Sequence, residues 1–213
     1  MVSQAPRLML ATGNAHKVQE LRSLLDALVG PGAFALTTPK DYPGVAEPEE
    51  TGSTFEENAL IKARYWARVA GSLALADDSG LVVDALDGRP GVCSARYAET
   101  VELRNRRVLE EMAEVADDRR AARFVCVAAL ADPDGGERLC RGEVVGAIAR
   151  APRGQEGFGY DPVFELAESA SAGLTLAEID KAAKNALSHR GRALAAIAPA
   201  LAASLRAGRV AAD

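Results

Sequence analysis

The chain has 213 residues and a mass of 22.3 kDa, and 48% of its residues are hydrophobic, so we expect one domain over residues 1–213 with a sizeable core. The formal net charge of −5 and the pI of about 5.2 exclude an overall basic field that would attract a nucleic acid or an anionic membrane surface. Cys93, Cys126 and Cys140 lack C-x-x-C spacing, and no run reaches about 18 apolar residues, so we expect reduced thiols in a cytoplasmic protein.

The first part of the chain alternates strand and helix patterns. Leu8–Ala11 is a short apolar run that ends in a tight turn, after which apolar residues recur at helical spacing. Phe34–Thr37 is a second candidate strand, and the stretch 39–52, rich in Pro, Gly and Glu, is a loop. Thr54-x-x-Glu57 is a capping-box pattern that predicts a helix with an apolar stripe to about Ala70.

The middle of the chain is richer in strand patterns. Leu73–Ala76 and Leu81–Val83 are apolar runs on either side of a polar tetrapeptide, so that its acids lie between two expected buried strands. Val101–Val115 has helical spacing. Ala122–Ala131 and Glu137–Ala149 are strand-like, and the Asp-Gly-Gly sequence between them predicts a turn.

The last part of the chain begins with an irregular, glycine-rich stretch, Arg153–Asp161. Two helical stretches with Ala and Leu stripes follow from Asp180 to about Arg206, with an expected break near Ser188. The mixed order of strands and helices predicts an α/β domain.

The turn after the first strand is a candidate phosphate site. Thr12, Gly13, Asn14, Ala15, His16 and Lys17 lie where a strand leads into a helix N-terminus, whose free N–H groups and dipole favour an anion. The alternative is a plain turn in which Asn14 only caps the helix. The segment is shorter than the G-x-x-x-x-G-K-[ST] loop, so the pattern by itself does not decide between them.

Asp77-Asp78-Ser79-Gly80 is a sharper candidate. Two adjacent carboxylates after an apolar strand are costly to bury unless a cation compensates their charge. Such hard oxygen ligands suit Mg²⁺, which usually bridges a few carboxylates to substrate phosphates. The alternative is a solvated turn.

Acidic and cationic side chains flank the second predicted helix. Three glutamates precede it and either form a solvated loop or bind a metal ion: Glu47, Glu49 and Glu50. Asn58 and Lys62 share one face of the helix, where they either point a cation at a phosphate or face water.

Two later segments carry groups suited to a nucleobase. Phe158, Gly159, Tyr160 and Asp161 form a loop whose aromatic rings either stack on a base or anchor the loop to the core, and anchoring is the interpretation that we favour for Tyr160. Donors that suit base carbonyls or phosphates, or that simply decorate the surface, follow near a helix start: Lys184, Ser188, His189 and Arg190.

Taken together, these segments resemble the inosine-triphosphate pyrophosphatase family of non-canonical purine nucleotide pyrophosphatases. The blocks run in the family's order from residue 12 to about residue 194, and the ordered set is far more specific than any one block. The matching blocks are Thr12-Gly13-Asn14-x-x-Lys17, Glu50-Thr51-Gly52-x-Thr54-Phe55-x-x-Asn58-Ala59-x-x-Lys62-Ala63, Asp77-Asp78-Ser79-Gly80-Leu81, Gly88-x-Pro90-Gly91-Val92-x-Ser94-Ala95-Arg96, Phe158-Gly159-Tyr160-Asp161-Pro162 and Ser188-His189-Arg190.

The resemblance implies an α/β fold with a long mixed central sheet, a nucleotide cleft between two lobes, and a homodimer. It also implies Mg²⁺-dependent hydrolysis of ITP, dITP and XTP to the monophosphate and pyrophosphate. Asp78 matches the family's proton acceptor and metal ligand, and Glu49 matches a second metal contact. The implied substrate-binding residues are Thr12, Gly13, Asn14, Ala15, His16, Lys17, Ser79, Phe158, Gly159, Tyr160, Asp161, Lys184, His189 and Arg190.

Two departures and three alternatives remain. The connection after Tyr97 is shorter than in many relatives, and Ala183 stands where many relatives have Glu. The alternatives are a Maf-type pyrophosphatase of modified nucleotides, whose pattern we do not find in the blocks, a nucleotide sensor without catalysis, and a structural interaction protein. Donors facing a 6-oxo group would reject the 6-amino group of ATP, but they leave discrimination against GTP unexplained.

Overall fold

The computed structural model describes residues 5–167 and 171–210. By internal packing the chain divides into two compact units. Unit 1 is Met1–Asp78, Val127–Arg141 and Gly191–Asp213, and unit 2 is Ser79–Cys126 and Gly142–Arg190. Asp78 and Ser79, both predicted site residues, are therefore the consecutive residues at which the chain passes from unit 1 to unit 2.

The strands form one mixed sheet in the order β2-β1-β3-β4-β5-β6. β1 is parallel to β2 and β3, whereas β5 is antiparallel to β6, so the predicted α/β class and mixed sheet are confirmed. The bounds are β1 Arg7–Leu10, β2 Ala35–Thr37, β3 Leu73–Val83, β4 Ala121–Ala131, β5 Glu137–Ile148 and β6 Phe164–Leu166.

β3 differs from the prediction of two short strands around an acidic segment. Leu73–Val83 is one continuous strand, and Asp77 and Asp78 lie inside it with 1% and 7% of their surface exposed. The alternative of a solvated turn is therefore wrong. A strand can retain two buried carboxylates here because a lysine pairs with each of them.

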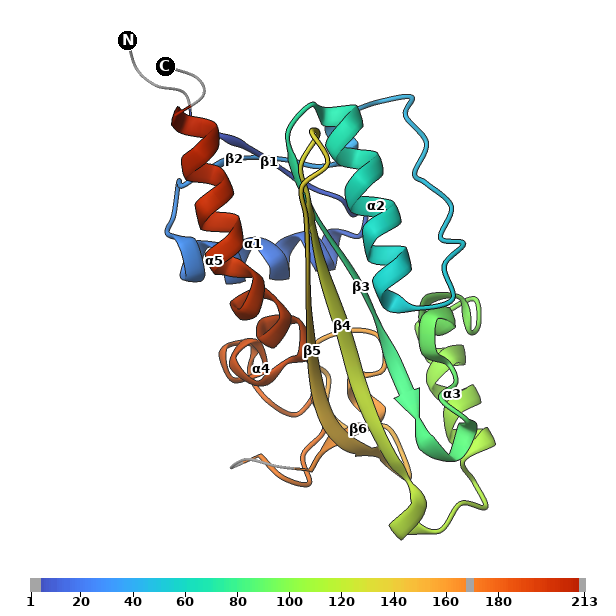
Figure 1. Ribbon diagram of the computed structural model, residues 1–213. Coiled ribbons are helices and arrows are strands. Elements are labelled where there is room, and N and C mark those ends of the chain that lie inside the picture. The colour runs from blue at the N-terminus through green and yellow to red at the C-terminus, as the bar shows by residue number, and fades with distance from the viewer. Residues whose placement is uncertain (1–4, 168–170, 211–213) are drawn as a thin grey trace. The chain divides into compact units, whose positions relative to one another are not determined.

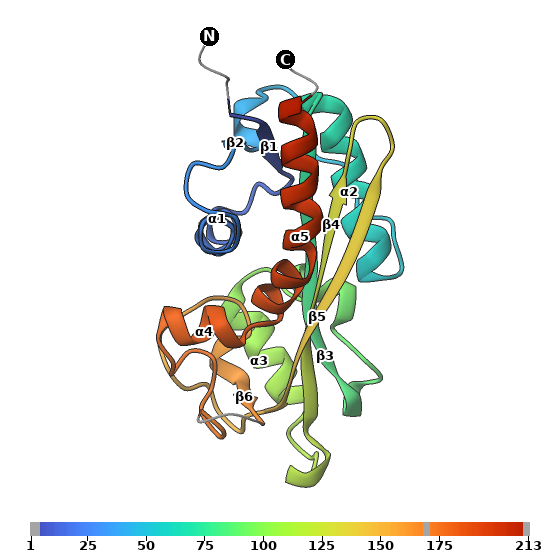
Figure 2. The same cartoon turned by 60° about the vertical axis from the view of Figure 1, so that its left-hand side comes forward.

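The helices of unit 1 begin where the sequence predicts them (Figure 1). α1, Ala15–Val29, begins after Asn14, and α2, Phe55–Ala70, begins with the predicted capping box of Thr54 and Glu57. Two ion pairs, Arg64 with Glu137 and Arg141 with Glu56, join α2 to β5. α5, His189–Val210, ends the described chain; Figure 2 shows it from a second side, with α1 seen end-on.

Unit 2 has its own apolar core, which includes Leu81 of β3, Phe124 of β4 and Phe164 of β6. α3, Val101–Glu111, and α4, Lys181–Leu187, are its helices, and the predicted break before α5 is at Ser188, whose ψ is 151°. The described residues of the two units also contain five 3₁₀ turns: Pro39–Asp41, Asp84–Leu86, Gly91–Arg96, Asp117–Arg119 and Asp161–Val163. None of the helices in the described ranges combines the length and apolar character needed to span a membrane.

Candidate active site

The turn between β1 and α1 is built around Asn14. Its Oδ1 accepts hydrogen bonds from the N–H groups of His16 and Lys17, at 3.0 and 3.3 Å, and its own N–H donates to Thr12 Oγ1 at 3.3 Å. Asn14 thus caps the helix. Because the cap already engages two of the N–H groups that a phosphate would use, phosphate binding by this turn stays a prediction.

Lys17 extends from the first turn of α1 to Asp77 of β3, next to the last β3 residue that belongs to unit 1. Its Nζ lies 3.0 Å from Asp77 Oδ2, and only 16% of the Lys17 side chain is exposed. The Lys17 ammonium group is therefore held just after the expected turn, with the buried Asp77 carboxylate as its partner.

Lys62 binds the second aspartate. Its Nζ donates to Asp78 Oδ1 at 3.0 Å and to Glu50 Oε1 at 2.8 Å, so the face that Lys62 shares with Asn58 points inward. Burial lowers the pKa of Lys62, but Asp78, Asp77 and Glu50 outweigh it and raise that pKa above its ordinary value. The structure thus holds a charged lysine among three carboxylates.

The two carboxylate oxygens of Asp78 differ in their hydrogen bonding. Oδ1 accepts from Lys62, whereas Oδ2 is buried and has no hydrogen-bond partner within the described residues. Burial raises the pKa of Asp78 above its ordinary value, although Lys62 and Lys17 oppose the shift. A buried, unsatisfied carboxylate oxygen is costly, which points to a ligand at this atom.

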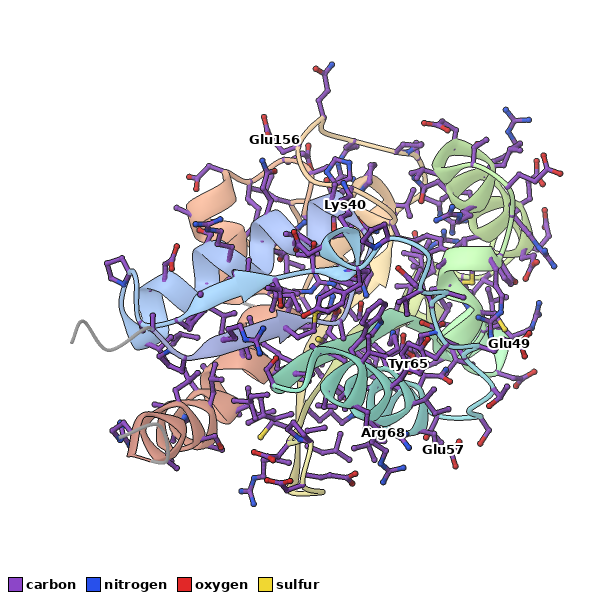
Figure 3. All side chains as sticks on the ribbon, turned by 90° about the horizontal axis from the view of Figure 1, so that it is seen from above. Lys40, Glu49, Glu57, Tyr65, Arg68 and Glu156 are labelled. Atoms are coloured by element: carbon purple, nitrogen blue, oxygen red, sulfur yellow. The ribbon has the colours of Figure 1, made fainter. Side chains whose placement is uncertain are left out.

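The three glutamates before α2 differ in position. Glu49 is exposed on the connection between β2 and α2 (Figure 3), whereas Glu50 reaches Lys62 and the Glu47 carboxylate lies over Gly13. The structure therefore brings Glu50, rather than the predicted Glu49, into the cluster with Asp78. Within the described residues, no group of three or more His, Cys, Asp or Glu side chains is arranged to hold a metal ion.

The connection that carries Glu50 is fixed to the start of α2. Asn58 Oδ1 accepts the N–H of Gly52 at 2.8 Å, and Glu57 Oε2 accepts the N–H groups of Ser53 and Thr54. A Cβ on Gly52 would lie 2.6 Å from Glu57 Cβ, so this position has no space for a side chain. Asn58 thereby acts through the backbone, holding the segment from which Glu50 projects.

In unit 2, the loop from Gly157 to Asp161 is fixed by a buried ion pair. Asp161 Oδ2 accepts the N–H of Phe158 and pairs with Lys184 Nζ, both at 2.6 Å. Lys184 Nζ also lies 4.6 Å from the centre of the Phe158 ring, and the guanidinium carbon of Arg190 lies 5.7 Å from it. Phe158, Asp161, Lys184 and Arg190 therefore form one cluster, as the family resemblance implies.

Tyr160 anchors the same loop to the core. Its hydroxyl donates to Ser94 O at 2.8 Å, and burial raises the pKa of Tyr160 well above its usual range. Asn105 of α3, which the sequence patterns do not single out, donates from Nδ2 to Gly159 O at 3.1 Å. The favoured interpretation of Tyr160 as an anchor is thus confirmed.

His189 and Arg190 begin α5 with buried side chains. The His189 imidazole stacks on Phe124, with ring centroids 4.8 Å apart, and Arg190 Nη2 donates to Ser79 Oγ at 3.1 Å. Neither side chain lies on the surface, since only 6% of His189 and 1% of Arg190 is exposed. No sequence pattern points to Phe124, because an aromatic residue in a buried strand is the ordinary content of a core.

Comparison with known proteins decides the family. The family model described as the Ham1 family matches residues 8–200. This chain belongs to the Ham1 family. A relative from Geobacter sulfurreducens named dITP/XTP pyrophosphatase is 50% identical over 89% of this chain and 93% of its own length. A second relative of that name, from Symbiobacterium thermophilum, is 51% identical over 95% and 98%.

Solved structures agree with this assignment. A HAM1 protein from Coxiella burnetii superposes with a TM-score of 0.81 at 42% identity, and covers 92% of this chain and 98% of that one. The Ham1 protein of Staphylococcus aureus superposes with a TM-score of 0.79 at 33% identity, over 92% and 97%. The fold and the sequence therefore agree on the Ham1 family.

Proposed function

We propose that this chain hydrolyses non-canonical purine nucleoside triphosphates, such as dITP, ITP and XTP, to the nucleoside monophosphate and pyrophosphate. The name dITP/XTP pyrophosphatase, which the two relatives at 50% and 51% identity carry, supports the substrate class. The observation that carries the proposal is the buried Lys62–Asp78 pair, in which one carboxylate oxygen faces no protein partner among the described residues. That arrangement suits attack on a phosphoryl group, which needs charge neutralisation and positioning more than covalent help.

The phosphate-binding part would consist of the turn after β1 and the two lysines. Lys17 and Lys62 each bind an aspartate in the structure, and a triphosphate brings further negative charge that their remaining donors can meet. The residues Thr12 to His16 lie at the N-terminus of α1, where the helix dipole favours an anion. Substrate binding by these residues is part of the proposal.

Mg²⁺ fits the donor set at Asp78. The buried Oδ2 is a hard oxygen without a partner among the described residues, and Mg²⁺ is usually held by one or two carboxylates, waters and substrate phosphates. Such a site needs no preformed cage of three protein ligands. Asp78 would hold the ion, with Glu49 as the second contact that the family resemblance implies. When bound, the ion would neutralise charge on the phosphate oxygens.

Asp78 is the residue that we propose as the proton acceptor. Lys62 fixes one carboxylate oxygen and so restricts rotation of the group. Burial raises the pKa of Asp78, which makes its carboxylate a better base for the attacking water than an exposed aspartate. Lys62 and Lys17 oppose that shift, which favours the ionised form needed for proton acceptance.

The base would be recognised by the cluster in unit 2. Phe158 offers a ring for stacking, and Lys184, His189 and Arg190 offer donors. Donors suit the 6-oxo group of hypoxanthine or xanthine and disfavour the 6-amino group of adenine. Selection against guanine, which also has a 6-oxo group, must come from exclusion of its 2-amino group.

The homodimer, the single domain over residues 1–213 and the cytoplasmic location also remain proposals. Size-exclusion chromatography with light scattering measures the first of them directly, and we expect a mass of two chains.

A panel of nucleotides tests the proposed function. Pyrophosphate release is measured from ITP, XTP, GTP and ATP with Mg²⁺ and with EDTA. We expect Mg²⁺-dependent release from ITP and XTP and much slower release from GTP and ATP. Equal turnover of GTP and ITP would refute the base preference. Binding of ITP without any release would instead indicate a nucleotide sensor.

A further inference from the structure

A parallel stack links β4 to the first residue of α5 inside unit 2. The rings of Phe124 and His189 lie 4.8 Å apart with an interplanar angle of 9°, and 6% of each residue is exposed. We propose that Phe124 is a positioning residue that fixes the plane of the His189 imidazole and thereby sets discrimination between 6-oxo and 6-amino purines. This inference rests on the proposed function, because it assigns His189 a role in reading the base.

The physical reason lies in where an imidazole can donate. An imidazole forms its hydrogen bonds in the ring plane, so the nitrogen that carries the proton donates along that plane, and the ring of an unconstrained histidine turns about its Cβ–Cγ bond. A hydrogen bond weakens steeply as its angle falls below about 120°. Because Phe124 covers one face of the ring, His189 is held so that its edge has a fixed direction. A 6-oxo oxygen accepts from such an edge, whereas a 6-amino group does not.

Both members of the stack lie beside further packed or hydrogen-bonded residues. The Phe124 ring packs on Phe164 of β6 with centroids 4.7 Å apart at 54°, and Phe164 is fully buried. On the helix side, Arg190 donates to Ser79 Oγ, which fixes the residue next to His189. The imidazole thus lies on the Phe124 ring, next to the fixed start of α5.

Phe164 provides a matched control, because it belongs to the same aromatic group but does not form the stack with His189. Phe124→Leu and Phe164→Leu each remove one aromatic ring from the core of unit 2 and should lower the melting temperature. Only Phe124→Leu removes the face on which the imidazole lies. A purely structural role predicts the same kinetic effect for both variants.

The kinetic test compares kcat/KM for ITP and ATP in the wild type and both variants. We expect Phe124→Leu to narrow the ITP-over-ATP ratio at least about tenfold, since misplacing a recognition group by a fraction of an ångström to 1 Å weakens its contribution strongly. Phe164→Leu should keep a ratio close to the wild type. An unchanged ratio in Phe124→Leu, or an equal loss in both variants, would overturn the proposal.

A second readout does not depend on catalysis. The chain has two histidines, so His16→Gln assigns the imidazole proton resonances of His189 in the NMR spectrum. Stacking on Phe124 should shift these resonances upfield by the ring current, and Phe124→Leu should abolish that shift. Where Phe124→Leu does not fold, Phe124→Met fills the space without an aromatic ring.

The two readouts separate the two hypotheses. If the wild type releases no pyrophosphate from ITP but shows the upfield His189 resonances, the proposed function fails while the stack stands. If the wild type is active but His189 resonates at its ordinary position, the positioning role of Phe124 is wrong and the proposed function stands.

Discussion

Lys62 Nζ lies 3.0 Å from Asp78 Oδ1, while the other oxygen of that carboxylate is buried and has no hydrogen-bond partner within residues 5–167 and 171–210. The pair therefore leaves Asp78 half engaged. Lys62 compensates its charge and restricts its rotation, and Oδ2 remains available for a water or a cation. This division of one carboxylate between a structural and a chemical role underlies the first two predictions.

Asp78→Asn should lower kcat about 10²–10⁴-fold, the usual loss when a general base is removed. It should leave the unfolding midpoint unchanged or raise it, because burial raises the pKa of Asp78 and so penalises its charged form. Pyrophosphate release and thermal unfolding measure the two effects. Asp84→Asn, an exposed aspartate paired with Arg123, is the control and should change neither quantity. Near-normal turnover in Asp78→Asn would exclude this residue as the base.

Glu49→Gln and Glu50→Gln should impair activity in different ways. Glu50 binds Lys62, so Glu50→Gln should lower kcat even at saturating Mg²⁺. Glu49 is exposed and is a proposed metal contact only, so Glu49→Gln should raise the half-saturating Mg²⁺ concentration at least about tenfold. A Mg²⁺ titration of activity separates the two. An unchanged Mg²⁺ requirement in Glu49→Gln would remove it from the metal site.

Gly52→Ala tests the attachment of the glutamate segment to α2. The added Cβ would lie 2.7 Å from Asn58 Oδ1 and 2.6 Å from Glu57 Cβ, so the backbone must shift at a cost of about 1–3 kcal/mol. We expect a lower free energy of unfolding and reduced activity, measured by urea denaturation and pyrophosphate release. Gly136→Ala is the control, because its Cβ would meet Asp132 Cβ at an ordinary 3.6 Å. Equal stability of the two variants would contradict the close packing at Gly52.

Glu111 gives a pH-dependent prediction for unit 2. Burial raises its pKa, but hydrogen bonds from Tyr97 and Arg107 outweigh burial, and the pKa is lowered below the ordinary value. Because the folded pKa is depressed, the stabilisation is present above the unfolded pKa near 4.5 and is lost as pH falls through the folded value. Glu111→Gln should cost about 1 kcal/mol of unfolding free energy at neutral pH.

Urea denaturation at several pH values tests this dependence. The difference between the wild type and Glu111→Gln should shrink as the pH falls below 4.5 and through the lowered pKa of Glu111. Glu110→Gln, an exposed neighbour on α3, should match the wild type throughout. A difference that stays constant with pH would show that Glu111 acts by packing alone.

The sequence predicted most elements because their signals are local. The capping box of Thr54 and Glu57 and the helix break at Ser188 depend on neighbouring residues only, and both are where the pattern put them. The sequence does not predict that β3 is continuous, because two adjacent aspartates are typical of a turn. The residues that compensate their charge, Lys17 and Lys62, are distant from them in sequence.

The sequence indicates which residue types could carry the chemistry of the candidate site, but not the direction in which each side chain points. Lys184, Asp161 and Phe158 meet, as the family resemblance implies, whereas their motifs alone indicate only a loop and a helix start. The choice between Glu49 and Glu50 depends on which way each side chain turns from an irregular connection, and no periodicity encodes that. Phe124 was missed for a different reason, because its strand position indicates only burial.

The products formed from dITP test the central claim most directly. The chain is incubated with dITP and Mg²⁺, and the products are separated by ion-exchange chromatography and followed by ³¹P NMR. Cleavage between the α- and β-phosphates gives dIMP and pyrophosphate in equal amounts, and this is the predicted result. Formation of dIDP and orthophosphate, or no reaction at all, would contradict it.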